Sequence, residues 1–292
     1  MKQIVIISGK GGTGKTTVSA ALADLAAHER KLVLADADVD ASNLELLLQP
    51  SLVSRTLFES GQTVTINQQT CLACGLCEQV CRFDAVITHA DEYSIDPHLC
   101  EGCLACLHQC PAGAISAQSR QTGEWYQSTT EYGALFHARL IPGEENSGKL
   151  VAEIIDQARQ NAAESRADVL LVDGPPGVGC PVTAALRSAD LVVLVSEPTV
   201  SGKHDLERVL EITRHFKLPA RLVLNKSNLS QRLRREILDY TESERVGLLG
   251  EIPYDESAIS ALITGRPITS LGGHALKPAL IAIWEQLRKE IG

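Results

Sequence analysis

The sequence lacks an excess of positive charge, a long hydrophobic run and a secretory signal pattern. Its formal net charge is −9, so no basic stripe is available for nucleic acid, and an anionic membrane surface would repel the chain. No apolar run reaches the ~18 residues that a membrane span requires. The N-terminal KQIVIIS resembles a strand and has no signal-peptide pattern. We therefore expect a cytoplasmic protein that binds neither nucleic acid nor membrane.

Aromatic residues are also scarce, at 4%, and there is no low-complexity tail or flexible linker. The 292 residues leave room for one large α/β domain and a small extra module, and a hydrophobic content of 44% is enough for a core. Cysteine, in contrast, is abundant, and eight of the nine cysteines lie between positions 71 and 110. Because the cytoplasm keeps ordinary thiols reduced, this cluster favours metal ligation or redox chemistry over disulfides.

Short apolar runs alternate with amphipathic stretches along most of the chain. The runs are rich in Val, Ile and Leu without polar alternation, which is typical of strands buried on both faces of a parallel sheet. The candidate strands are residues 2–7, 31–35, 168–172, 191–195, 220–224 and 246–252. The candidate helices are residues 15–29, 150–163, 202–216 and 230–240, the last with Ser230 as its N-cap. The pattern predicts an α/β fold with a doubly wound, mostly parallel sheet.

This alternation stops between about residues 62 and 148, where the cysteines lie. We interpret the break as an insertion. Residues 1–62 and 119–292 are predicted to form one discontinuous domain, and residues 63–118 an inserted domain. The polar stretch SRQTGEWYQSTTEYG, residues 119–133, has the pattern of a hairpin.

The first apolar run leads into the segment SGKGGTGKTT, which matches the P-loop motif. Its glycines let backbone N–H groups point at phosphate oxygens, and the following helix adds its N-terminal dipole. Lys15 is predicted to neutralise the β and γ phosphates of ATP, and Thr16 to place its hydroxyl on Mg²⁺. The alternative is a tight turn without a ligand. The loop residues predicted to hold the nucleotide are Gly9, Gly11, Gly12, Thr13, Gly14, Lys15, Thr16 and Thr17.

Carboxylates follow two of the candidate strands. Asp36, Asp38 and Asp40 occupy alternate positions, which places them on one face if the strand persists. Like charges so close are costly unless a metal offsets them, so a nearby Mg²⁺ site is a reasonable inference. Asp40 alternatively reads as an exposed turn residue. Asp173 ends the run DVLLV, and a hydrophobic strand followed by an acid is typical of the Walker B position.

Lys10 within the loop is the signature of the deviant Walker A motif, and the chain resembles the MinD, ParA and nitrogenase iron protein class of P-loop ATPases. The resemblance implies that Lys10 reaches the nucleotide of a partner subunit, which makes ATP bind a homodimer together. Considered alone, Lys10 could equally be a solvated charge. The resemblance also implies that Asp38 positions the attacking water and that Asp36 lies near the metal.

The same resemblance extends to residues that would contact the base. Asn225 resembles the adenine-reading asparagine of the class, and the segment with Pro253 and Asp255 resembles its second base-contacting loop. Asparagine at a strand end is also a common turn residue, so this part of the match is weaker. Catalysis would depend on Lys10, Lys15, Asp38 and Asp173.

The eight clustered cysteines form two runs with the spacing C-x2-C-x2-C-x3-C. In such runs three thiolates wrap one 4Fe–4S cluster and the fourth ligates the other cluster. The first predicted ligand set is Cys71, Cys74, Cys77 and Cys110, and the second is Cys100, Cys103, Cys106 and Cys81. Tetrahedral zinc is the alternative for paired C-x2-C motifs. The ninth cysteine, Cys180, is interpreted as structural.

Residues 63–118 resemble a two-cluster bacterial ferredoxin, which implies an α+β inserted domain. Pro111 follows the last cysteine of the second run, but Arg82 stands at the matching position of the first. This difference affects local packing or potential and leaves the ligands intact.

Together the motifs predict an ATPase whose dimer switch is coupled to electron transfer through two 4Fe–4S clusters, with a redox partner that the sequence does not identify. An alternative is ATP-dependent assembly or delivery of Fe–S clusters, as in Mrp-type carriers. Such carriers hold a labile cluster on a C-x2-C pair in the ATPase half, and this chain has no such pair there. A third reading is a positioning or regulatory switch whose clusters sense redox state.

Overall fold

The computed structural model describes residues 1–90, 92–144 and 147–292. The chain divides into two compact units, which we call the sheet unit (Met1–Thr56 and Glu124–Gly292) and the cysteine unit (Leu57–Gly123). Both boundaries fall inside strands, β3 (Ser51–Ile66) and β6 (Ile115–Thr130), so each of these strands belongs to both units. The sequence-based domain limits of 63 and 118 stay a prediction.

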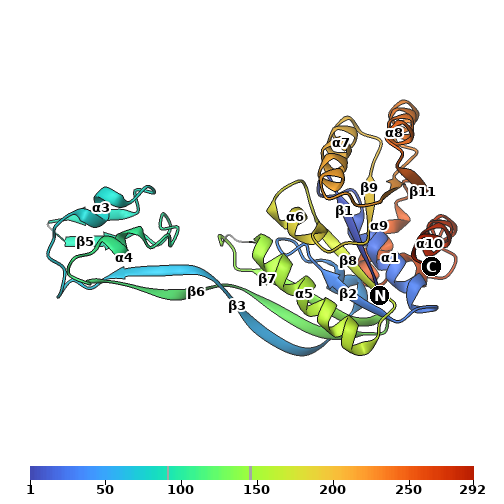
Figure 1. Ribbon diagram of the computed structural model, residues 1–292. Helices are drawn as coiled ribbons and strands as arrows, with labels where there is room; N and C mark the ends of the chain where they lie inside the picture. The colour runs from blue at the N-terminus through green and yellow to red at the C-terminus, as the bar shows by residue number, and fades with distance from the viewer. Residues whose placement is uncertain (91, 145–146) are drawn as a thin grey trace. The chain divides into compact units, whose positions relative to one another are not determined.

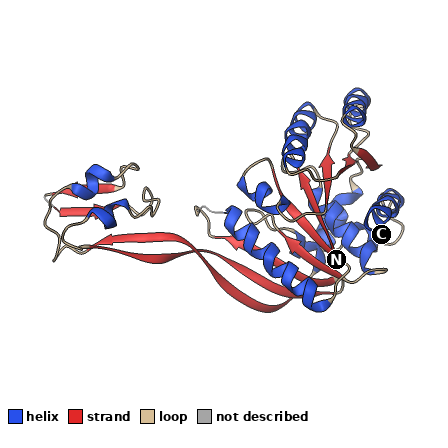
Figure 2. Ribbon diagram, in the orientation of Figure 1, coloured by secondary structure: helices blue, strands red, loops and turns tan. Residues whose placement is uncertain are grey.

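A nine-stranded sheet forms the centre of the sheet unit, in the order β11-β10-β9-β1-β8-β2-β7-β6-β3 (Figure 2). All pairs from β11 to β7 are parallel. Besides β3 and β6, the strands are β1 (Lys2–Ser8), β2 (Leu32–Asp36), β7 (Gly133–Leu140), β8 (Val169–Pro176), β9 (Leu191–Ser196), β10 (Ala220–Asn225) and β11 (Gly247–Ile252). The expectation of an α/β fold with a mostly parallel sheet is confirmed.

The parallel strands are continuous apolar runs because helices cover both faces of the sheet. Helices α1 (Lys15–Ala27) and α10 (Lys277–Ile291) contact one another on one face, whereas α5 (Ser147–Ser165) and α6 (Cys180–Leu186) pack together on the other (Figure 1). The remaining helical elements of the unit are α2 (Leu44–Leu48), α7 (Val200–His215), α8 (Gln231–Ser243), α9 (Ser257–Thr264) and η1 (Ile268–Ser270). The four candidate helices are therefore found with small shifts of their ends. Ser230 caps α8 as predicted, and its Oγ accepts from the N–H of Leu233 at 3.3 Å.

The sequence reading missed how far the sheet extends beyond β2. Residues 115–130 form one continuous strand, β6, and the chain turns only at 131–132, so the predicted hairpin in 119–133 has its turn near its end. Thr129 Oγ1 donates to Ser51 O, and Thr65 Oγ1 contacts Ser116 Oγ at 3.0 Å, so β3 and β6 run antiparallel. Both strands contain many polar residues and no continuous apolar run, so the criterion of buried apolar runs did not identify them as strands.

The cysteine unit contains two similar turns of helix. Helices α3 (Leu76–Val80) and α4 (Ala105–Gln109) contact each other, and each follows a residue in the left-handed region, Gly75 (φ 75°) and Leu104 (φ 64°). Strands β4 (Val86–His89) and β5 (Glu92–Ile95) pair antiparallel between them along the sequence. Each cysteine run therefore folds into the same loop and helix.

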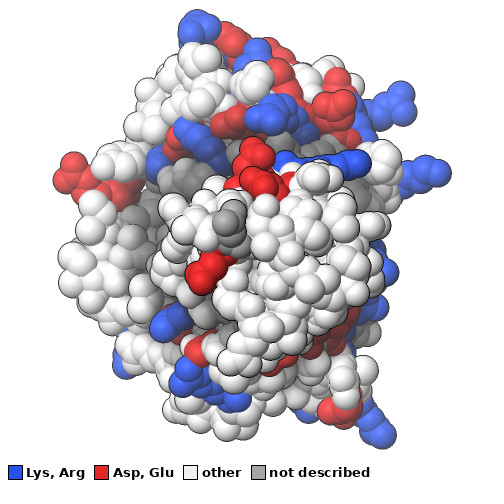
Figure 3. All heavy atoms as spheres, turned by 90° about the vertical axis from the view of Figure 1, so that its left-hand side faces the viewer, with Lys and Arg blue, Asp and Glu red and all other residues white. Residues whose placement is uncertain are grey.

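None of the helices within the described residues is long and apolar enough to cross a membrane. On the face drawn in Figure 3, Lys and Arg side chains are interspersed with Asp and Glu. This mixture agrees with the absence of a basic excess in the composition.

The turn between β6 and β7 depends on Gly133, which generates a test of the fold. Its φ of 145° is strained for any residue with a side chain, and a Cβ there would lie 2.3 Å from Leu32 O. Gly133→Ala is expected to lower the free energy of unfolding by about 2–4 kcal/mol in urea denaturation. Gly272→Ala is the control because, among the described residues, a Cβ at Gly272 meets nothing within 4 Å. Equal stability of the two variants would contradict this account of the turn.

Candidate nucleotide cleft and cysteine pockets

A cleft of about 670 Å³ opens at the carboxyl ends of the central strands, where doubly wound sheets bind ligands. Of the predicted loop residues, Gly11 to Thr17 line it and Gly9 does not. Asp38 and Asn43 from the segment after β2 also border the cleft. The other residues that line it are Ser8, Asp40, Ala41, Leu46, Leu47, Pro175, Pro176, Pro181 and Leu262.

The loop after β1 has the geometry of an anion-binding turn. Gly12 and Gly14 have φ of 79° and 90°, and a Cβ on Gly14 would lie 2.2 Å from Asn225 Nδ2. Gly14 also begins α1, and no side chain among the described residues caps that helix end. The first N–H groups of α1 are therefore available to phosphate oxygens, as the glycine spacing predicted.

Lys15 places a buried ammonium group in the cleft, with its side chain only 6% exposed. Its Nζ donates to Asp173 Oδ1 at 2.9 Å and lies 3.6 Å from Asp38 Oδ2. Burial by itself lowers the pKa of Lys15, but the two carboxylates outweigh it and hold that pKa above its usual value. Lys15 is therefore a fixed positive charge, and Asp38 and Asp173 lie on either side of it.

Asp173 has one carboxylate oxygen in use and one spare. Oδ1 accepts from Lys15 Nζ and from Ser19 Oγ at 2.8 Å, whereas Oδ2 is buried with no hydrogen-bond partner among the described residues. A buried acceptor without a donor is costly unless a water or ion satisfies it. With the Thr16 side chain also in the cleft wall, the donor set fits an octahedral Mg²⁺ that keeps several of its waters.

The three alternating acids do not share one face, because β2 ends at Asp36 and the chain then turns. Asp36 is fully buried, Asp38 is half-buried and Asp40 is exposed. The Asp36 carboxylate accepts from Ser42 Oγ at 2.8 Å and from the N–H of Leu44 at 2.9 Å. Burial and then the charge of Asp173 raise the pKa of Asp36. Asp36 thus ties the start of α2 to β2, and its role toward the metal stays a prediction.

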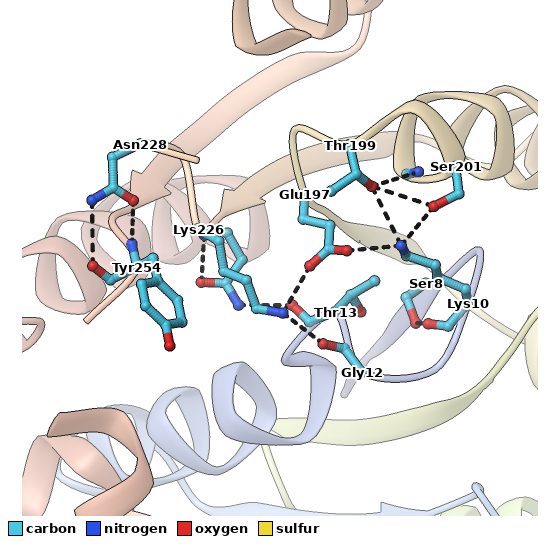
Figure 4. A network of polar contacts seen from close by, with 12 residues as sticks. Ser8, Lys10, Gly12, Thr13, Glu197, Thr199, Ser201, Lys226, Asn228 and Tyr254 are labelled. Carbon is cyan, nitrogen blue, oxygen red and sulfur yellow. Dashed lines mark hydrogen bonds and ion pairs between the residues drawn. The ribbon is translucent and has the colours of Figure 1, made fainter. Parts of the chain in front are cut away.

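Lys10 does not project into solvent. Its Nζ lies 2.8 Å from Glu197 Oε1 and donates to Ser201 Oγ at 2.8 Å and to Thr199 Oγ1 at 3.3 Å (Figure 4). The other oxygen of Glu197 accepts from Lys226 Nζ at 2.7 Å. Burial alone would raise the pKa of Glu197, but the two ammonium groups hold it below its usual value. One buried carboxylate thus binds two lysines.

The segment after β10 holds the loop from its other side. Asn225 Nδ2 donates to Thr13 O at 2.7 Å, and Lys226 Nζ donates to Gly12 O at 2.9 Å. Asn225 is therefore occupied by the loop backbone and does not line the cleft. Asn228 fixes the backbone of Tyr254 through both its amide atoms (Figure 4).

Two other predicted residues lie away from the cleft lining. Pro253 is exposed and Asp255 half-buried, directly after β11, and neither lines the cleft.

The sequence reading missed the roles of Glu197, Lys226 and Ser19. Ser19 lies four residues after Lys15 on α1, so helical periodicity places both on one face. Glu197 and Lys226 directly follow β9 and β10, whose carboxyl ends meet at the edge of the sheet where the loop lies. The sequence predicted that these residues lie at strand ends. It did not predict which charges pair with one another, because the pairs form between segments that are distant in the sequence.

The cysteine unit contains two pockets, each lined by four cysteines. One pocket is lined by Cys71, Cys74, Cys77 and Cys110, and the other by Cys81, Cys100, Cys103 and Cys106. Each pocket thus takes three cysteines from one run and the fourth from the other run. Apolar residues complete the walls, among them Tyr93 in the first pocket and Phe83 in the second.

All eight of these thiols are free of disulfides, as is exposed Cys180 at the start of α6. Burial raises the pKa of Cys77 and of Cys106. Within the described part of the chain, no three His, Cys, Asp or Glu side chains are close enough together to hold a metal ion.

The sequence of residues 4–268 matches the family of the CobQ/CobB/MinD/ParA nucleotide-binding domain. An uncharacterized protein of Methanocaldococcus jannaschii is 36% identical over 234 residues, which cover 78% of this chain and 79% of that protein. An uncharacterized ATP-binding protein of the same organism is 27% identical over 292 residues, covering 99% and 87% of the two chains.

The septum site-determining protein MinD of Escherichia coli is 24% identical, with 91% of this chain and 83% of that protein covered. The structure of MinD from Pyrococcus horikoshii complexed with Mg-ADP superposes with a TM-score of 0.62 at 21% identity, covering 100% of this chain and 97% of that one. The sheet order, the loop geometry and the matched residues lead to one conclusion. The chain belongs to the CobQ/CobB/MinD/ParA family of nucleotide-binding proteins.

Proposed function

We propose that the protein is an ATPase in which MgATP in the cleft controls electron transfer through two 4Fe–4S clusters. The observation that carries the proposal is the presence, in one chain, of a nucleotide cleft and of two pockets lined by crossed sets of four cysteines. A nucleotide-driven change is useful to an electron carrier because it can make transfer depend on hydrolysis.

In the proposed nucleotide site each side chain has a defined task. Lys15 neutralises the β and γ phosphates, and Thr16 with the spare oxygen of Asp173 holds hydrated Mg²⁺. Asp38, which borders the cleft beside Lys15, accepts a hydrogen bond from the attacking water and orients it. Burial raises the pKa of Asp38 above its usual value, which favours acceptance of a proton.

The cysteine pockets suit clusters better than single zinc ions. Zinc needs four ligand atoms within about 2.0–2.3 Å of one ion, whereas a cluster separates its four thiolates. Each pocket takes three cysteines from one run and the fourth from the other, which is the pattern of paired 4Fe–4S clusters and is not needed for two separate zinc sites. A 4Fe–4S cluster supplies one-electron redox chemistry, and this chain's part is to hold it by thiolates and enclose it in apolar walls.

Lys10 is proposed to act in a homodimer, where it would reach the nucleotide of the partner. In the single chain its ammonium is held by Glu197, Thr199 and Ser201. Dimer formation with ATP would therefore exchange these contacts for contacts with phosphate oxygens. The exchange would make closure of the dimer dependent on the nucleotide.

Two alternative functions, cluster delivery and a positioning or regulatory switch, require different features of the chain. A cluster-delivery factor needs a labile site in the nucleotide-binding half, but the only cysteine of the sequence outside 71–110 is Cys180. A positioning or regulatory switch would keep nucleotide-dependent dimerisation after loss of its clusters, as expected of a protein similar to the septum site-determining proteins. Electron transfer is favoured because four cysteines line each pocket.

The two halves of the proposed function can be separated by substitution. Lys15→Ala should abolish ATP hydrolysis, because it removes the ammonium group that is proposed to neutralise the β and γ phosphates, and should keep the visible absorbance of the clusters. Cys74→Ser should lower that absorbance and keep hydrolysis. Cys180→Ser, outside both pockets, is the matched control and should change neither signal. Full ATPase activity in Lys15→Ala would show that the P-loop assignment is wrong.

The strength of MgATP-dependent dimerisation should depend on the ion pair between Lys10 and Glu197. Glu197→Gln removes the charge that binds Lys10 and Lys226, so MgATP-dependent dimerisation measured by analytical ultracentrifugation should become up to about tenfold tighter, or ~1.4 kcal/mol. Glu236→Gln is the control, since Glu236 pairs with Lys203 and Arg232. Lys10→Ala should dimerise poorly. If it dimerises as the wild type does, Lys10 does not act across the dimer.

The coupling itself can be measured by an anaerobic redox titration followed by electron paramagnetic resonance, with and without a non-hydrolysable MgATP analogue. Binding linkage requires that a nucleotide which prefers one redox state shifts the potential. A shift of about 59 mV corresponds to roughly 1.4 kcal/mol for one electron. An unchanged potential in both clusters would leave docking, delivery or a redox-sensing role as the better account.

A further inference from the structure

The short helix α2 connects the nucleotide cleft with the strands that lead to the cysteine unit. It follows the Asp38 segment, and its Leu46 and Leu47 line the cleft. A five-residue helix has little stability of its own, so contacts made by its side chains decide where it lies. Asp36 fixes its first turn through the N–H of Leu44.

On its other side α2 is joined to β7 through Glu45. His137 Nδ1 lies 3.0 Å from Glu45 Oε2, and Arg139 donates to Glu45 Oε1. Contact with His137 lowers the pKa of Glu45 to about 2, against the opposing effect of burial, and Arg139 lowers it further. Glu45 is therefore ionised at neutral pH, and a shift of α2 would have to carry or break these contacts.

The next contacts join β7 to β6. His137 is 4% exposed, and its ring stacks on that of Tyr126 with centroids 5.0 Å apart and planes at 23°. Its Nε2 lies 3.1 Å from Ser128 Oγ, which is 1% exposed. Arg139 lies over the same Tyr126 ring, 5.9 Å from its centroid. The buried His137 and Ser128 side chains cannot move independently of their neighbours, so this pair of strands can transmit a displacement.

The last contacts join β6 to β3. The hydroxyl of Tyr126 donates to Glu124 Oε2 at 2.6 Å, and the other oxygen of Glu124 accepts from Arg55 on β3. We call the connected side chains the polar relay: Glu45, His137, Arg139, Tyr126, Glu124 and Arg55. All six belong to the sheet unit.

The relay ends where the chain passes between the units. Thr56 and Glu124 are the last and first residues of the sheet unit on β3 and β6, and Arg55 precedes Thr56. These strands are the only two covalent connections to the cysteine unit, and the Arg55–Glu124 ion pair joins them at that point. Ile66 ends β3 five residues before Cys71, and β6 begins five residues after Cys110.

We propose that the polar relay positions β3 and β6 according to the state of α2, and so couples the nucleotide cleft to the cysteine unit. The inference rests on the proposed function and names the residues that carry its coupling. A nucleotide contact that displaces α2 changes the contacts of Glu45 with His137 and Arg139 on β7. The Tyr126 ring, which stacks on His137, then shifts its hydrogen bond to Glu124 and with it the ion pair between Glu124 and Arg55. By linkage, the redox state of the cysteine unit then changes nucleotide affinity by the same factor.

The test uses full-length, cluster-loaded protein and substitutions at the two ends of the relay. Glu45→Gln removes the charge at the inner end, and Tyr126→Phe removes only the hydroxyl that binds Glu124 and keeps the stacked ring. Glu29→Gln is the control, because Glu29, two residues after the end of α1, forms an ion pair with Arg288 on α10, away from the relay. Hydrogen exchange of residues 51–56 and 124–130 is measured with and without the MgATP analogue, together with the redox titration.

In the wild type and Glu29→Gln we expect the analogue to change exchange of both strands and to shift the potential. Both substitutions in the relay should reduce each response at least threefold, while Tyr126→Phe keeps ATP hydrolysis within about twofold of the wild type, because it leaves the cleft lining unchanged. Tyr126→Phe keeps the test valid if Glu45→Gln fails to fold.

Two results would overturn the relay: no change of exchange in the wild type, or a wild-type response that persists in Tyr126→Phe. Failure of the proposed function looks different. If the analogue changes exchange of the strands through the relay but leaves the potential unshifted, the relay stands and ATP-controlled electron transfer does not.

Discussion

The buried ammonium of Lys15 is the constraint on which the nucleotide cleft depends. A buried charge is costly unless it is paired, and Asp173 and Asp38 supply the partners. Asp173 lies within the carboxyl-terminal half of β8 and Asp38 lies just after the end of β2, and β8 lies between β1 and β2 in the sheet. The strand order therefore delivers both acids to the loop that follows β1. In the proposed nucleotide site, phosphates would replace the carboxylates as partners of Lys15, and the two acids would then be able to bind water and metal.

A second buried carboxylate organises the opposite side of the loop. Glu197 binds Lys10 and Lys226 together, and Lys226 in turn holds the carbonyl of Gly12. The loop is thus fixed by its own charges before a ligand arrives, which lowers the ordering cost of binding. The same arrangement makes Lys10 part of a network within the chain, so any role across a dimer has to compete with Glu197.

The cysteine unit is attached by paired strands, not by a flexible linker. β3 and β6 belong to the central sheet at one end and continue toward the cysteine runs at the other. Two cysteine runs with the same loop and helix then line two pockets.

Local motifs determined much of this protein. The P-loop glycines, the parallel strands and the two cysteine runs were all readable, because loop conformation, burial of a strand and reach between nearby thiolates depend on residues close in sequence. Only the tertiary structure decided the rest. It ended β2 at Asp36, so that three alternating acids separated, and it added β7 and the polar strands β6 and β3 to the sheet. It also joined Glu197 to two lysines and Glu45 to His137, pairs whose members lie far apart in the chain. Such pairs leave no local pattern, since their stability comes from burial that exists only after the sheet has formed.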